Sequence, residues 1–121
     1  MRKSATAVAA SALLAVVISP TVTTAVEAAD QAMIDEGRQI AFDRKKGNCL
    51  ACHHISGGDM AGNIGPMLIA MQARYPDRAK LRAQIWDSTH ANANSMMPPF
   101  GRHEILTESE IDSVVEFVHS L

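Results

Sequence analysis

Two cysteines and a histidine form the feature that most constrains this chain. Cys49, Cys52 and His53 follow the order C-x-x-C-H, and the chain has no other cysteine. Two thiols at this spacing can each form a thioether to one porphyrin, and the adjacent imidazole can then ligate its iron. The motif therefore predicts one covalently attached haem c, with His53 as one ligand to the metal, and a fold built around this large group.

Three other uses of a cysteine pair fit the sequence less well. A thioredoxin-like redox site requires a βαβ setting, and no segment of the chain alternates as a strand does. A structural zinc site requires four ligands, more than this motif gathers. A disulfide would suit an exported protein, but a bridge across two residues constrains little of the chain. We therefore expect haem attachment.

The first 28 residues have the layout of a secretory signal peptide. Two basic residues precede an uncharged apolar run over residues 5–18, and small residues at positions 26 and 28 suit cleavage. The run is short for a hydrocarbon layer of about 30 Å, so we prefer a cleaved signal to an uncleaved anchor. We expect export to the periplasm and a single mature domain over residues 29–121.

The charge balance argues against nucleic acid as a partner. The chain has 11 Lys and Arg against 13 Asp and Glu, a formal net charge of −2 at pH 7. Surfaces that bind nucleic acid neutralise phosphates with many basic side chains. A balance this mild is better suited to docking a protein partner. We expect no association with the membrane once the signal has been removed.

Apolar periodicity predicts two helices before the last loop of the chain. Residues 31–43 have one apolar face of helical period, formed by Met33, Gly37, Ile40 and Ala41. A second helix should open with Pro76 at its first position, where the missing N–H costs little. Its apolar face should contain Leu81 and Ile85.

The closing segment has the clearest helix signal. Thr107 and Glu110 form a capping box, in which each side chain can accept a hydrogen bond from the other residue's backbone. Apolar residues then recur with helical spacing at Ile111, Val114, Val115, Val118 and Leu121. Because no segment shows strand alternation, the predicted fold class is all-α.

An electron-transfer haem needs a second axial ligand, and the sequence offers many. The candidates are His54, His90, His103, His119, Met33, Met60, Met67, Met71, Met96 and Met97. His54 adjoins the motif histidine and cannot reach the opposite face of the iron, and His119 is expected at the surface. Methionines within helices are usually core residues. Met96 and Met97 differ, because the two prolines after them would fix the position of a thioether ligand.

Pro66 has a second possible role beside the haem. A ligating histidine usually donates its other ring N–H to a fixed acceptor, and the Pro66 carbonyl would suit His53. An ordinary Gly-Pro turn in the glycine-rich loop over residues 56–67 explains the same residues equally well.

These features, taken in order, resemble the class I cytochrome c family. A helix, C-x-x-C-H, Gly-Pro-x-Leu, a Met-Pro loop and a closing helix follow one another. The resemblance implies that the terminal helices cross, with Gly37 packed against Phe117. It also implies that Pro66 accepts the hydrogen bond of the haem histidine. Met97, directly before the prolines, would be the second metal ligand, with Met96 as the alternative.

Three segments make the resemblance more specific than the order of motifs alone. Residues 62–66, 73–87 and 97–103 are similar to the SoxX family, the monohaem subunits of periplasmic SoxAX complexes. The similarity extends roughly over residues 47–121. Met67 departs from the pattern, because a second proline is expected there. The resemblance implies an L-cysteine S-thiosulfotransferase, which oxidatively joins thiosulfate to a cysteine of a SoxYZ-like carrier protein.

Two functions follow from these expectations. In the first, the chain accepts electrons within a heterodimer, and a SoxA-like subunit carries the sulfur chemistry. Both thiols are used by the haem, so the chain has no sulfur nucleophile and is not catalytic alone. A downstream cytochrome c would take the electrons. In the second, the chain is a free-standing soluble electron shuttle, although only Lys45 and Lys46 supply basic charge just before the motif.

Overall fold

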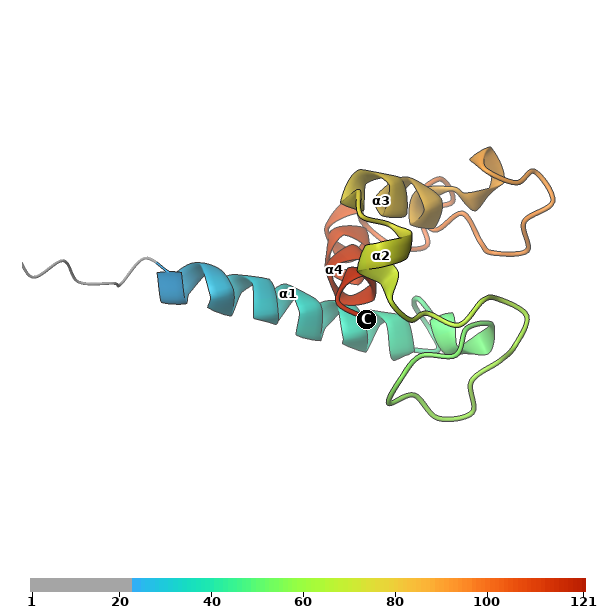
Figure 1. The fold of residues 1–121 in the computed structure, drawn as a ribbon. Coiled ribbons are helices and arrows are strands. Elements are labelled where there is room, and N and C mark those ends of the chain that lie inside the picture. The colour runs from blue at the N-terminus through green and yellow to red at the C-terminus, as the bar shows by residue number, and fades with distance from the viewer. Residues whose placement is uncertain (1–22) are drawn as a thin grey trace, which may run out of the picture.

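The computed structural model describes residues 23–121, and within this range the chain is helical and has no β-strand (Figure 1). The elements are α1 (Thr23–Phe42), η1 (Cys49–Ala51), α2 (Met71–Arg74), α3 (Arg78–Trp86), η2 (Ser88–His90) and α4 (Glu108–His119), where η marks a 3₁₀ helix. The predicted all-α fold class is confirmed. No helix in the described range has the length and apolar character needed to cross a membrane.

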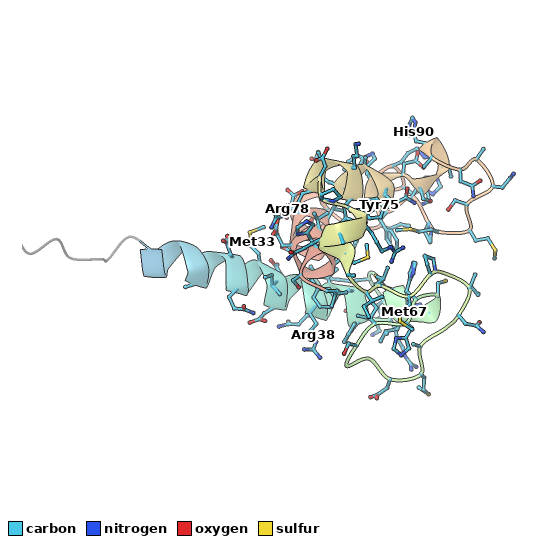
Figure 2. The ribbon with its side chains drawn as sticks, in the orientation of Figure 1. Met33, Arg38, Met67, Tyr75, Arg78 and His90 are labelled. Atoms are coloured by element: carbon cyan, nitrogen blue, oxygen red, sulfur yellow. The ribbon has the colours of Figure 1, made fainter. Side chains whose placement is uncertain are left out.

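The expected signal peptide falls only partly within the described range. Residues 1–22 lie outside it, and residues 23–28 form the first turns of α1. α1 therefore begins eight residues before the predicted start at residue 31, because the alanine-rich sequence in these turns favours a helix. Cleavage after Ala28 stays a prediction. Met33 is 36% exposed, unlike the other residues of the predicted apolar face, and lies where α1 extends beyond α4 (Figure 2).

The crossing of α1 and α4 is the centre of the fold (Figure 1). A Cβ atom on Gly37 would collide with the carbonyl of Ser113 and would lie 2.9 Å from Cβ of Phe117. The ring of Phe42 meets that of Phe117 edge to face, with centroids 5.8 Å apart. The buried Ser113 hydroxyl donates to the Glu36 carboxylate at 2.8 Å. The crossing therefore requires glycine at position 37, and Gly37 does pack against Phe117.

The start of α4 has the predicted capping box. The Thr107 hydroxyl accepts a hydrogen bond from the Glu110 N–H at 3.3 Å, and the Glu110 carboxylate accepts one from the Thr107 N–H at 2.9 Å. The other carboxylate oxygen of Glu110 pairs with Lys46. The Lys46 ammonium, followed by the Thr107 N–H, holds the pKa of Glu110 below its usual range. One carboxylate thus stabilises the helix start and fixes the chain just before the cysteine motif.

α3 begins differently from the prediction. The Asp77 carboxylate accepts a hydrogen bond from the Ala79 N–H at 2.9 Å and caps the helix. Pro76 therefore precedes the cap and does not occupy the first helical position. Aspartate supplies a side-chain acceptor for the free N–H groups of the first turn, so it makes the stronger N-cap. Leu81 and Ile85 are buried as predicted.

The C-terminal end of α4 is covered by a helix that the sequence did not predict. α2 has four residues, and the Met71 N–H at its start donates to the Leu121 carbonyl at 2.8 Å. His119, at the end of α4, is only 6% exposed, so the expectation of a surface histidine is wrong. Its Nε2 atom is buried and has no hydrogen-bond partner among the described residues.

Candidate functional site

Two loops that project from the same end of the helices enclose a cavity of about 590 Å³ (Figure 1). The first loop contributes Cys49, Cys52 and His53 to the lining, and the second contributes Met96 and Met97. Helices add an apolar part of the lining, formed by Met71, Leu81, Ile85, Val114 and Val118. The structure thus brings the cysteine motif at residues 49–53 and the methionines at residues 96–97 to one site.

The two thiols enter the cavity from the short helix η1 and from the residue that directly follows it. The Cys49 carbonyl accepts hydrogen bonds from the N–H groups of Cys52 at 3.2 Å and His53 at 2.9 Å. This tight turn lets all three side chains line the same cavity. Both thiols are free and half-buried, and burial raises the pKa of the Cys49 thiol to about 11. Within residues 23–121 no three His, Cys, Asp or Glu side chains gather as a metal site.

The imidazole of His53 is fixed by the Pro66 carbonyl, 2.6 Å from its Nδ1 atom. A carbonyl only accepts, so Nδ1 carries the proton and Nε2 presents its lone pair. Gly65 lies against the ring, where a Cβ atom would stand 2.7 Å from Nδ1. The ring is therefore held in the tautomer and orientation that leave Nε2 free to bind a metal.

Backbone pairing holds the Pro66 carbonyl in place. The Gly65 N–H donates to the Cys52 carbonyl at 2.8 Å, and the Leu68 N–H donates to the His54 carbonyl at 2.9 Å. Pro66 lies between these two bonds and has no N–H of its own to satisfy. Its carbonyl is therefore directed at the imidazole by the same segment that carries the histidine.

Met67 occupies the position where a second proline was expected. Its side chain is 49% exposed on the loop (Figure 2). Its carbonyl accepts a hydrogen bond from Arg74 at 2.8 Å, and Arg74 also lines the cavity. The Arg74 guanidinium thus fixes the backbone at a position where proline would have restricted it.

The structure narrows the candidates for a second axial ligand. Of the ten histidines and methionines considered, only Met71, Met96 and Met97 line the cavity. Met71 is a core residue at 2% exposure, and the Met96 side chain is 77% exposed. Met97 is half-buried and packs against the core. His90 is exposed at the outer surface of its loop (Figure 2).

The methionine loop is anchored to the end of α3. The Gly101 N–H donates to the Trp86 carbonyl at 3.1 Å, and a Cβ atom on Gly101 would collide with the indole ring. Asp87, 3% exposed, pairs with Nε of Arg102 at 3.0 Å and accepts hydrogen bonds from Thr89. The Thr89 hydroxyl, followed by its N–H and the Arg102 guanidinium, holds the pKa of Asp87 below its usual range.

Sequence reasoning missed the polar residues that fix this loop. Asp87, Ser88 and Thr89 follow directly after α3, and Asp and Ser in such positions typically form turns through side-chain hydrogen bonds. That signal predicts a turn after the helix. It does not predict which distant residue, such as Arg102, completes the contact.

Three comparisons place the chain among known proteins. The family model for cytochrome c matches residues 34–121. The crystal structure of SoxXA from P. pantotrophus is similar with a TM-score of 0.64 and 26% sequence identity, over 71% of this chain and 79% of that chain. An uncharacterized lipoprotein of Aquifex aeolicus (strain VF5) is 37% identical over 76 residues, which are 62% of this chain and only 37% of that protein. The chain belongs to the cytochrome c family, and its fold is that of a SoxX-like class I cytochrome c.

Proposed function

We propose that this chain is the electron-accepting monohaem subunit of a periplasmic SoxAX-type complex, an L-cysteine S-thiosulfotransferase. The observation that carries the proposal is the cavity, in which both thiols of the chain, His53 and the Met97 loop meet. The similarity to SoxXA supports the choice of complex. The signal-like residues 1–28 and the lipoprotein relative support export, with residues 29–121 as the mature domain.

Membership of the cytochrome c family implies a covalently attached haem c, and the residues present fit this group. Two free thiols, an imidazole with an available Nε2 and a thioether line one largely apolar cavity. We assign Cys49 and Cys52 to the two thioether bonds. His53 and Met97 would be the protein ligands to the iron, and Pro66 would be the acceptor that orients His53. When bound, the haem would supply one-electron redox chemistry.

The cysteine count supports a division of labour between subunits. Joining thiosulfate to a carrier cysteine forms a sulfur–sulfur bond and releases the thiol proton and two electrons. Both cysteines of this chain are assigned to the haem, so the chain offers no sulfur nucleophile. A SoxA-like partner would carry the sulfur chemistry on a SoxYZ-like carrier. This chain would receive the electrons one at a time and pass them to a downstream cytochrome c.

Co-purification and reduction together test the complex. The protein should leave the native periplasm with a larger haem protein, and its haem should become reduced when thiosulfate and the carrier are both present. A carrier that lacks its cysteine is the matched control and should give no reduction. Isolation as a monomer that thiosulfate never reduces would refute the proposal and favour the free-standing shuttle.

Adjacent methionines provide the test of the metal ligand. Met97→Ala should abolish the methionine-to-Fe(III) charge-transfer band of the oxidised protein, while the haem stays attached on a denaturing gel. Met96→Ala is the matched control, because that side chain is exposed and should leave the band unchanged. The opposite pattern would move the ligand to Met96.

A further inference from the structure

Ser88 is a fully buried serine at the start of η2, with 0% of its surface exposed. Its hydroxyl oxygen lies 2.9 Å from the Met97 carbonyl and 2.8 Å from the hydroxyl oxygen of Ser95. The Met97 N–H in turn donates to the Ser95 hydroxyl oxygen at 3.2 Å. Two serine hydroxyls therefore contact both backbone polar groups of the methionine that we assign to the iron.

The chemistry of the groups fixes the direction of the two hydrogen bonds to the Met97 backbone. A carbonyl only accepts and a serine hydroxyl has one proton, so Ser88 donates to the Met97 carbonyl. The Ser88 hydroxyl also points its proton side toward the Ser95 hydroxyl oxygen, which accepts from the Met97 N–H. The buried Ser88 hydroxyl is thus satisfied by Met97 and Ser95.

The turn that contains Ser88 is itself held by polar contacts. Asp87, which is buried and paired with Arg102, accepts the Thr89 N–H and so shapes the turn that contains Ser88. The backbone of Met97 can shift only by breaking a hydrogen bond to its N–H or its carbonyl. The cost would be high on the carbonyl side, because the Ser88 hydroxyl is sealed from water and would lose its acceptor.

We propose that Ser88, together with Ser95, positions Met97 and opposes its displacement from the iron by competing ligands. The inference rests on the proposed function in one respect, namely that Met97 is the axial ligand. Both serines bond the backbone of Met97, so each would act through that backbone. Removing the Ser88 hydroxyl should ease displacement of the thioether and leave haem attachment and the His53 side unchanged.

Imidazole titration of the oxidised holoprotein tests the inference. Loss of the methionine-to-Fe(III) band reports displacement of Met97, and Ser88→Ala should reach half-displacement at about tenfold lower imidazole, equivalent to about 1.4 kcal/mol. Ser113→Ala is the matched control, because Ser113 is also buried (3% exposed) but bonds Glu36 at the helix crossing. That control should titrate like the unmodified protein.

A second variant keeps the test decisive if Ser88→Ala fails to fold. Ser95→Ala removes the acceptor of the Met97 N–H, and the substitution is made at a partly exposed loop residue. It should shift the titration in the same direction by a smaller factor. Equal titrations for unmodified, Ser88→Ala and Ser95→Ala proteins would overturn the positioning role alone. Absence of the band from the unmodified protein would instead overturn the assignment of Met97, and the inference with it.

Discussion

The His53 side and the Met97 side of the cavity are stabilised in different ways. On the His53 side, the thiols and the imidazole come from one short turn, and a backbone segment supplies the Pro66 acceptor. On the Met97 side, separate side chains fix the loop, with Ser88 on the backbone of Met97 and Asp87 on Arg102. The His53 side depends on residues that are neighbours in the sequence. The Met97 side depends on polar side-chain contacts that single substitutions can remove.

The largest effect is expected when both thiols on the His53 side are removed. The double substitution Cys49→Ala and Cys52→Ala leaves no thiol for attachment, so haem should be absent from a denaturing gel. Helix content by circular dichroism should also fall, because a domain this small would lose the covalent group that supplements its core. His54→Ala is the control, since that side chain is exposed and should leave staining intact. Persistent covalent haem in the double variant would contradict the assignment.

A pair of glycine substitutions should separate the two sides. Gly65→Ala places a methyl group against the His53 ring, and Gly101→Ala places one against the Trp86 ring. Each should lower the free energy of unfolding by about 2 kcal/mol, as overpacking commonly does. Only Gly101→Ala should weaken the methionine-to-Fe(III) band, while Gly65→Ala should alter the haem spectrum through His53. Identical spectra for the two variants would show that the sides are not independent.

A smaller effect is expected from Asp87, and it depends on pH. The pKa of this carboxyl is depressed in the folded protein, chiefly by the Thr89 hydroxyl. A depressed pKa adds stability above the ordinary aspartate value near 3.9, and that stability is lost as the pH falls through the folded value. Asp87→Asn should therefore lower the thermal midpoint at neutral pH, and the difference should shrink in acid. A difference that grows in acid would contradict this account.

Local patterns made the His53 side and the closing helix predictable. C-x-x-C-H is contiguous, and Thr107 with Glu110 is a cap within four residues, so each is complete in the sequence. The resemblance to class I cytochrome c also implied the crossing at Gly37, where the structure leaves no room for a Cβ atom.

The Met97 side was less predictable because its contacts join residues of common type across loops. Nothing in the sequence pairs Ser88 or Ser95 with Met97. Arg102 is an ordinary basic loop residue in the sequence, and only the structure shows its ion pair with Asp87. α2 was missed because four residues are too few to show helical periodicity.

The contact between Glu36 and Ser113 has a consequence for the order of folding. These residues are 77 positions apart, and they close the helix crossing that supports the whole domain. Closing so long a segment carries an entropic cost before any contact repays it, and such non-local pairings form slowly. During synthesis the crossing must wait until α4 has left the ribosome, so a chain in transit stays incompletely folded. A chain in which α1 must meet α4 therefore lacks its central helix pair until residues 108–119 have been made.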